Sequence, residues 1–247
     1  MIDLTGKTAL ITGANGGLAP GLARSLAKAG AVVVLGVRQS RARADLLAAE
    51  IGAVVVSGDV SDPHGVESVI AAASAAGPLD IVVNNAALQP TSSYLDTDVS
   101  TWDVVAGANL RSTHLMTRAA AQHMIESSIA GSIINIGSIE GSQPAPFHVH
   151  YATAKAGLIM LTRGAALELG EHQIRVNSVS PGLIDDGEVG DRWPEGVDRW
   201  NAAAPLKRLV SPTDVGNAVA FLASDLAAAI TGHDLVVDAG VLTHPTW

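Results

Sequence analysis

The sequence contains no cysteine, which excludes disulfide bonds, thiol catalysis and cysteine-ligated zinc together. Charged residues make up only 16% of the 247 residues and form no long polar tract, so we expect a compact globule rather than a disordered chain. The 15 basic residues are scattered, and the formal net charge is -9. This charge pattern argues against binding to nucleic acid or to an anionic membrane surface.

The amino-terminal stretch MIDLTGKTALITG carries charged residues before its first apolar run. That run is too short for a signal peptide or a membrane span. We therefore expect a cytoplasmic protein that acts on small molecules.

Seven short runs rich in valine and isoleucine recur along the chain, at 8–12, 31–37, 53–57, 80–84, 131–137, 174–180 and 234–240. Each run is apolar almost throughout, which is the pattern of a strand covered on both faces. Helix-length segments alternate with the runs, at 17–29, 40–50, 63–76, 101–127, 151–170 and 212–224. This alternation predicts an α/β fold: a single doubly wound Rossmann-type domain over residues 1–247, whose parallel sheet of about seven strands has helices on both faces.

One long irregular stretch interrupts the pattern, at 181–205, and its glycines and prolines are typical of a loop with short helical pieces. Long loops inside compact domains are usually functional lids or disordered. Trp193 and Trp200 favour the lid, because large apolar rings gain from being covered. We therefore expect a substrate-covering loop around 183–205.

A glycine-rich turn, TGANGGLA, joins the first predicted strand to the first predicted helix. Its glycines at 13, 16 and 17 let backbone amides approach a pyrophosphate closely, and the helix amino terminus supplies partial positive charge. A turn of this kind can also be purely structural, so the motif by itself leaves both interpretations open.

Further motifs make the chain similar to the short-chain dehydrogenase/reductase family. The family's T-G-x-x-x-G-x-G pattern is present as Thr12, Gly13 and Gly17, with Ala19 in place of the last glycine. Its N-N-A-G pattern is present as Asn84–Ala87, again with alanine in place of glycine. Each departure adds one methyl group, and the dinucleotide fingerprint tolerates alanine at the first of these positions.

The later matches follow the family's order and spacing over the rest of the chain. Asn109 lies where the family has its helix asparagine, and Ser138 follows the fifth predicted strand. Tyr151 and Lys155 form Y-x-x-x-K beyond that serine, and Pro181-Gly182 follows the sixth strand. The resemblance implies an NAD(P)-dependent oxidoreductase that interconverts a secondary alcohol and a ketone, or a sugar or polyol hydroxyl and its carbonyl, by hydride transfer.

Tyr151 and Lys155 belong to residue types that are scarce here, with two tyrosines and four lysines in the chain. Residues four apart on a helix face the same way. A free tyrosine titrates at about pH 10, and a nearby ammonium favours the phenolate, so we expect Lys155 to lower the pKa of Tyr151. Tyr151 would then act as the acid/base. For this spacing alone, an exposed pair on an ordinary helix is the alternative.

The resemblance implies roles for the other catalytic residues. Ser138 would hydrogen-bond the substrate oxygen, Lys155 would hold the nicotinamide ribose, and Asn109 would anchor a water that relays protons to Lys155. Without the resemblance, Ser138 could be a strand-end cap and Asn109 a helix-kink residue. The resemblance also implies which residues contact the dinucleotide: Gly13, Asn15, Gly17, Leu18, Arg38, Asp59, Val60, Asn85, Ala86, Tyr151, Lys155, Pro181, Gly182 and Ile184.

The end of the second predicted strand, GVRQS, bears on the choice of dinucleotide. NAD enzymes usually place an acidic side chain there, and Val37 takes that position in this chain. Arg38 follows, with Arg41 and Arg43 near, so a 2'-phosphate would meet positive charge. The glycine turn has no basic residue. We expect NADP to be preferred, with NAD as the alternative.

The segment between Ser138 and Tyr151 resembles the corresponding loop of bacterial glucose 1-dehydrogenases in this family, and Gln89-Pro90 is similar to a polar loop there. The polar residues of this segment that could meet a hydroxylated substrate are Glu140, Gln143, His148 and His150. A sugar or polyol is one candidate, and other alcohols and ketones remain open. The two histidines lack a third ligand at recognisable spacing, so no metal site is expected.

Two other function classes can be weighed against an enzyme of this family. A catalytically silent dinucleotide-binding regulatory protein would have little reason to keep all four predicted catalytic residues. A serine hydrolase would need a G-x-S-x-G nucleophile elbow, which GSIEG does not supply. By resemblance we expect a homotetramer or homodimer built on the long helices at 101–127 and 151–170, with a small alcohol, ketone or sugar as its substrate.

Overall fold

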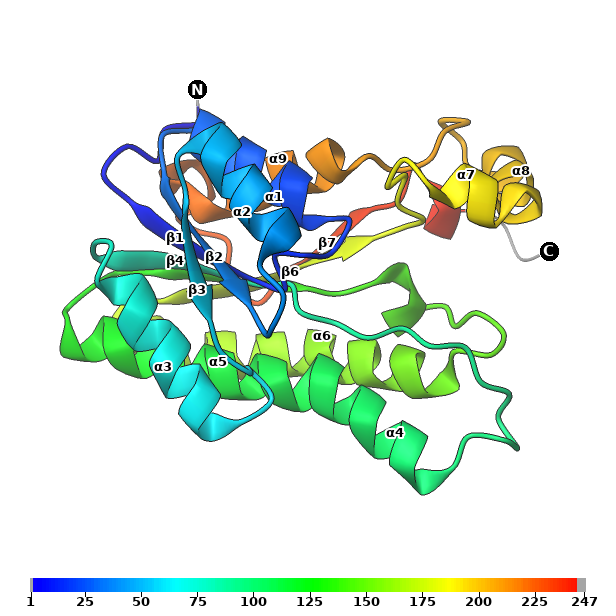
Figure 1. Ribbon diagram of the computed structural model, residues 1–247, viewed down its shortest axis with the longest axis horizontal. Coiled ribbons are helices and arrows are strands. Elements are labelled where there is room, and N and C mark those ends of the chain that lie inside the picture. The colour runs from blue at the N-terminus through cyan, green and yellow to red at the C-terminus, as the bar shows by residue number, and fades with distance from the viewer. Residues whose placement is uncertain (1, 244–247) are drawn as a thin grey trace.

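A computed structural model describes residues 2–243 and shows a seven-stranded parallel sheet between two layers of helices (Figure 1). The strands are β1 (Thr8–Thr12), β2 (Val32–Val37), β3 (Val54–Ser57), β4 (Leu79–Asn84), β5 (Ser132–Ile136), β6 (Arg175–Pro181) and β7 (Asp234–Val237). Their order in the sheet is β3-β2-β1-β4-β5-β6-β7, and every neighbouring pair is parallel. The predicted fold class is confirmed.

The central strands are buried along their whole length, because helices cover both faces of the sheet. One layer holds α1 (Ala19–Lys28), α2 (Ala42–Ile51) and α9 (Pro212–Ala223), and its side chains form one apolar core with β1 and β2. The other layer holds α3 (Pro63–Ser74), α5 (Ser112–Glu126) and α6 (Val149–Leu169), which form a second core on the opposite face. Continuous apolar strands are the sequence signature of this double coverage.

The predicted helix at 101–127 is three pieces rather than one. α4 (Val99–Ala106) is capped by Asp98, whose side chain accepts a hydrogen bond from Thr101 N at 2.7 Å. A π-helical turn (Gly107–Arg111) follows, and α5 continues from it. Asn109 lies inside the π turn, where one extra residue alters the direction of its side chain relative to a regular helix.

β7 ends at Val237 instead of continuing to residue 240 as predicted. The Asp238 carboxylate accepts hydrogen bonds from Gly240 N at 2.8 Å and Leu242 N at 2.7 Å, and Ala239 has a left-handed φ of 55°. These bonds turn the chain away from the sheet. Short 3₁₀ turns complete the described chain, at Ile139–Gly141, Gly170–His172, Asp225–Ala227 and Val241–Thr243.

The predicted loop at 181–205 carries two short helices, α7 (Val189–Arg192) and α8 (Pro194–Ala203). They lie beyond the carboxyl ends of the strands, away from the rest of the helices (Figure 1). Trp200 anchors α8, because its indole packs on Gly182 and its Nε1 donates to Arg208 O at 3.0 Å. Within residues 2–243, no helix combines the length and apolar character needed to span a bilayer.

Candidate active site

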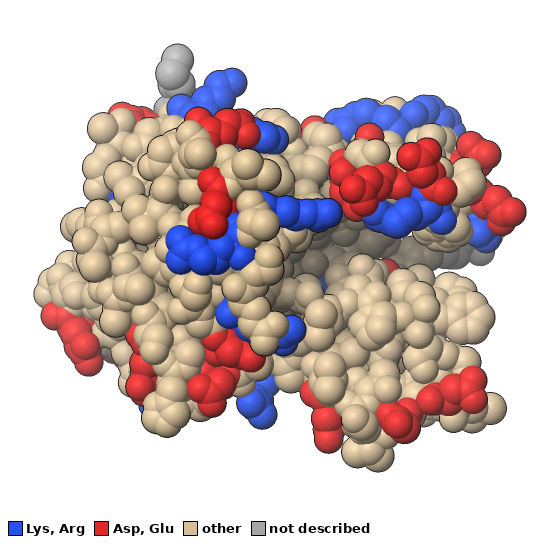
Figure 2. Space-filling model, in the orientation of Figure 1, with Lys and Arg blue, Asp and Glu red and all other residues tan. Residues whose placement is uncertain are grey.

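A cleft of about 1540 Å³ opens at the carboxyl ends of the strands. In Figure 2 it is the hollow between the lobe formed by α7 and α8 and the lower body of the molecule. All residues that the sequence assigned to the dinucleotide line this cleft, as do Ser138, Tyr151 and Lys155. Asn109 does not line it and is buried in the adjacent π turn. In doubly wound sheets, this edge is where ligands bind.

The glycine turn after β1 lies very close to the chain that follows β4. Gly13 has a φ of +68°, and a Cβ built there would lie 2.7 Å from Ala86 Cα. The Thr12 hydroxyl holds the two strand ends together, because it accepts from Asn85 N at 3.0 Å and Ala86 N at 3.1 Å. Only glycine suits Gly13, since both the backbone conformation and the space exclude a side chain.

The amino terminus of α1 offers its backbone donors to the cleft. Leu18, the residue before the helix, makes no capping hydrogen bond with its side chain. Within the described chain, the N–H groups of Gly17 and Leu18 donate to no protein acceptor. Such a terminus suits a phosphate group. The Asn15 side chain makes its contacts within the protein. It donates to Ser40 O and accepts from Ala44 N, which ties the turn to α2.

Arg38 and Asp59 lie at the end of the cleft farther from Tyr151. Arg38 is exposed and follows the buried Val37, which leaves no carboxylate at the end of β2. Hydrogen bonds from the Ser61 hydroxyl and N–H, at 2.6 Å and 2.9 Å, lower the pKa of Asp59, and the Arg38 charge contributes to the same shift. This end therefore combines the exposed Arg38 cation with the Asp59 carboxylate.

Three of the predicted catalytic residues meet at the opposite end of the cleft. Tyr151 and Lys155 come from the first turns of α6, and Ser138 begins the 3₁₀ turn after β5. The Lys155 Nζ lies 5.5 Å from the centre of the Tyr151 ring and donates to Ile136 O at 2.7 Å. The shared helix face predicted for the tyrosine and the lysine is confirmed, and both side chains are buried instead of exposed.

The pKa of Tyr151 shifts in the opposite direction to the one expected from the sequence. Burial raises the pKa of this phenol, the hydrogen bond with Ser138 lowers it, and the Glu140 charge raises it further. Burial also lowers the pKa of Lys155 to about 8. The prediction that Lys155 lowers the pKa of Tyr151 is wrong for this structure, because loss of water disfavours the charged form of both groups.

Asn109 is held rigidly behind the catalytic residues. Its Nδ2 donates to Leu88 O at 2.7 Å and to Val105 O at 2.9 Å. Its Oδ1 is buried and accepts no hydrogen bond from the described residues. A buried acceptor with unused capacity is what the predicted water anchor requires. Its role in proton relay stays a prediction.

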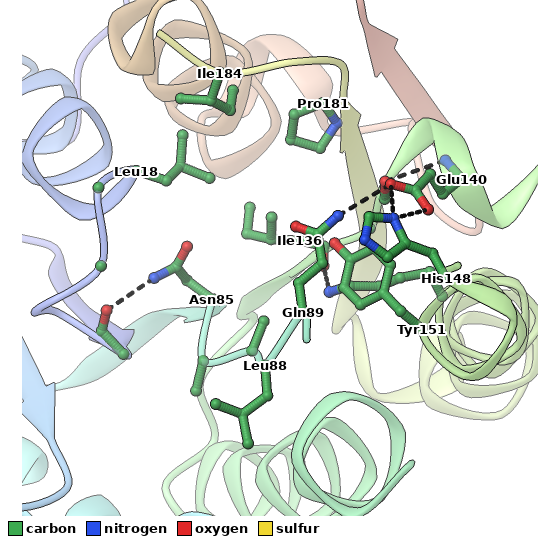
Figure 3. Close-up of a pocket in the computed structure, with 18 of the residues that line it drawn as sticks. Leu18, Asn85, Leu88, Gln89, Ile136, Glu140, His148, Tyr151, Pro181 and Ile184 are labelled. Carbon is green, nitrogen blue, oxygen red and sulfur yellow. Dashed lines mark hydrogen bonds and ion pairs between the residues drawn. The ribbon is translucent and has the colours of Figure 1, made fainter. Parts of the chain in front are cut away.

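The polar residues expected near a substrate divide into two groups. Glu140, Gln143 and His148 line the cleft, and Figure 3 shows Glu140 and His148 gathered beside Tyr151 and Gln89. His150 is buried away from the cleft lining, because its Nδ1 accepts from Tyr151 N at 2.9 Å inside the first turn of α6. His150 is therefore not among the side chains that face the cleft.

The backbone carbonyls of Ile136 and Leu88 orient Lys155 and Asn109, and the sequence does not predict either contact. A backbone acceptor has no side-chain signature, so no residue pattern could have identified them. The sequence predicts that Trp200 belongs to a lid, but it does not predict that Trp200 packs against Gly182 at the cleft.

The chain is similar to known proteins over nearly its whole length. Residues 13–242 match the family model described as enoyl-(acyl carrier protein) reductase. The chain is 36% identical to an L-rhamnose 1-dehydrogenase (NAD(P)(+)) from Sphingomonas sp. (strain SKA58), over 96% of this chain and 97% of that protein. It is 32% identical to glucose 1-dehydrogenase 2 from Bacillus subtilis, over 99% and 98%. A crystal structure of a short-chain type dehydrogenase/reductase from Mycobacterium marinum superposes with a TM-score of 0.89 at 33% identity, over 97% and 96%.

Proposed function

The chain belongs to the short-chain dehydrogenase/reductase family, and from this premise we propose that it interconverts a secondary alcohol and a ketone with Tyr151 as the acid/base. One observation carries the proposal. The Tyr151 phenol, the Ser138 hydroxyl and the Lys155 ammonium meet at one end of a cleft whose other end is the glycine turn and the amino terminus of α1.

The residues of the cleft fit a nicotinamide dinucleotide. Gly13 removes the side chain that would block the strand ends, and the N–H groups of Gly17 and Leu18 are available to a pyrophosphate. Asn85 fixes the turn, because its Nδ2 donates to Thr12 O at 2.9 Å and Gly13 O at 3.1 Å. When bound, the cofactor supplies or accepts the hydride.

The protein's own contribution is to place the reacting oxygen and to move one proton. Ser138 donates to the substrate oxygen and steadies the charge that develops on it. Tyr151 takes the hydroxyl proton in oxidation and returns it in reduction. Lys155, whose Nζ lies 5.5 Å from the centre of the Tyr151 ring, would hold the ribose of the nicotinamide. The segment at 183–205 covers the substrate, with Trp193 and Trp200 along the cleft wall.

NADP is the proposed preference between the two dinucleotides. Arg38 is an exposed cation on the cleft wall, and Val37 leaves no carboxylate to repel a 2'-phosphate. The name of the L-rhamnose 1-dehydrogenase that the chain resembles includes NAD(P)(+), so use of either dinucleotide agrees with the comparisons.

The assembly that we propose is a homotetramer or homodimer built on α4, α5 and α6, which correspond to the predicted helices at 101–127 and 151–170. These helices leave large apolar side chains exposed, among them Trp102, Met160 and Leu167. Light scattering of the purified protein tests the assembly. A mass of one chain at working concentration would contradict it.

Absorbance of the reduced nicotinamide tests the proposed reaction. Purified protein is mixed with NAD or NADP and a panel of alcohols, or with the reduced cofactors and ketones. We expect turnover, and replacement of Ser138 with alanine should lower kcat about 100-fold while leaving dinucleotide binding unchanged. Dinucleotide binding without turnover of any alcohol or ketone would instead identify a silent regulatory protein.

A further inference from the structure

Three polar side chains form a connected group beside Tyr151, which we call the polar cluster: Gln89, Glu140 and His148 (Figure 3). Gln89 Nε2 donates to Glu140 Oε1 at 3.0 Å, and His148 Nδ1 lies 3.0 Å from Glu140 Oε2. The His148 ring meets the Tyr151 ring edge-on, with 6.1 Å between the ring centres. The polar cluster therefore lies next to the proposed acid/base.

The polar cluster presents hydrogen-bond acceptors that the described residues leave unused. A carboxylate has about four lone-pair positions, and among the described residues Glu140 receives donors only from Gln89 and His148. His148 Nδ1 faces that carboxylate, which leaves Nε2 as the second polar atom of the ring. Neither this Nε2 nor Gln89 Oε1 has a protein partner in residues 2–243. The unmet groups suit a ligand that donates from hydroxyl groups.

The burial of the Glu140 and His148 side chains distinguishes this pair from an ordinary surface ion pair. The side chains of Glu140 and His148 are only 14% and 17% exposed, although both line the cleft. Removing a carboxylate from water is costly unless it is paired. The other histidine–glutamate pairs, His64 with Glu67 and His172 with Glu171, lie at the surface with longer separations of 3.7 Å and 3.8 Å. Of these three pairs among the described residues, the pair in the cleft is the one that is both close and shielded.

The loops that carry the polar cluster are fixed in place. Phe147, the neighbour of His148, has a left-handed φ of 66°, which is unusual for an aromatic residue. Its carbonyl accepts from Ser92 N at 2.9 Å, so the loop before α6 is tied to the loop after β4 at a second point. Strained backbone of this kind persists where the surrounding structure holds a functional group in position.

We infer that the polar cluster binds a second hydroxyl group of the substrate, close to the reacting carbinol, and so makes the enzyme select polyhydroxylated substrates over simple secondary alcohols. Glu140 accepts from that hydroxyl, while Gln89 and His148 hold the carboxylate toward the cleft. This inference rests on the proposed oxidoreductase function. It adds the substrate class and the residues that determine it.

The test compares each polyol or sugar that is oxidised with its analogue that lacks one neighbouring hydroxyl. We expect Glu140→Gln and His148→Ala to lower the ratio of kcat/KM for the polyol to kcat/KM for the analogue about 10- to 100-fold, because any effect on Tyr151 alters both values alike. The matched control is Glu67→Gln, which alters a histidine–glutamate pair on the exposed face of α3 and should change neither value. Turnover of the analogue also shows that each variant is folded.

An equal loss for both substrates would mean that the polar cluster only clamps two loops, and it would overturn the inference. Oxidation of simple alcohols without oxidation of any polyol would also overturn it and would leave the proposed function standing. Absence of turnover with every alcohol and both dinucleotides would contradict the proposed function itself.

Binding gives a readout that does not depend on turnover. The ring proton resonances of His148, assigned with the His148→Ala variant, should shift when the polyol is added to the protein. The analogue should leave them in place. A shift of equal size with both compounds, or with neither, would contradict a hydroxyl-specific contact.

Discussion

The chemistry of single residues in this cleft is set by what surrounds them. Burial raises the pKa of the Tyr151 phenol, the hydrogen bond with Ser138 lowers it, and the charge of Glu140 raises it. Lys155 loses its water in the same place, which brings its pKa to about 8. A sequence pattern identifies the pair, but the direction of a pKa shift depends on burial, and burial is known only once the chain is folded.

Arg38 carries the proposed preference for NADP. Replacing Arg38 with alanine should weaken NADP binding about 10- to 100-fold and leave NAD binding within about threefold, because a charge-assisted hydrogen bond to the 2'-phosphate is lost. Fluorescence titration with each dinucleotide measures both values. Arg118→Ala, which removes an exposed cation of α5 outside the cleft lining, is the control. If Arg38→Ala weakened the binding of NAD and of NADP equally, Arg38 would not contact the 2'-phosphate.

Among the elements, the turn between β1 and α1 shows how the backbone prepares the cleft. Gly13→Ala should destabilise the protein and weaken dinucleotide binding, since alanine would meet both a left-handed φ and the backbone of Ala86. Gly52→Ala is a matched control, because Gly52 has a φ of +72° with nothing within 4 Å of a built Cβ. We expect the control to cost about 1–2 kcal/mol and Gly13→Ala to cost clearly more.

Thermal and denaturant unfolding measure the two variants, and a dinucleotide titration completes the comparison. If Gly13→Ala were no less stable than Gly52→Ala, the close approach to Ala86 would not be what requires glycine at this position.

The elements also show what a sequence can and cannot predict. Six strands begin and end within one residue of their predicted limits, since buried strands are apolar on both faces. The π turn around Asn109 was missed, because one inserted residue hardly alters the apolar spacing of a long helix. The contact between Gln89 and Glu140 joins residues 51 positions apart, and no local pattern encodes such a pairing.

At the scale of the whole molecule, burial of Lys155 links the active site to stability. The pKa of Lys155 is about 8 in the folded protein against 10.5 for the ordinary group, so the unfolded chain binds more protons between these values. The free energy of unfolding should therefore rise from pH 8 to pH 10, by up to about 1.4 kcal/mol per pH unit from this group.

Lys155→Met should remove that contribution, while Lys28→Met, at the exposed end of α1, should retain it. Denaturant unfolding at a series of pH values measures the slope for each protein. A wild-type slope equal to that of Lys155→Met would mean that the lysine keeps its ordinary pKa in the folded protein.

The central claim is that Tyr151 transfers the proton, and the chain provides its own control because it contains only one other tyrosine. Tyr94 is 71% exposed and lies outside the cleft lining. The most direct measurement is kcat for Tyr151→Phe and Tyr94→Phe with the same alcohol and dinucleotide. We predict that Tyr151→Phe binds the dinucleotide normally but loses turnover by at least about 100-fold, while Tyr94→Phe keeps it. Wild-type turnover by Tyr151→Phe would contradict the account.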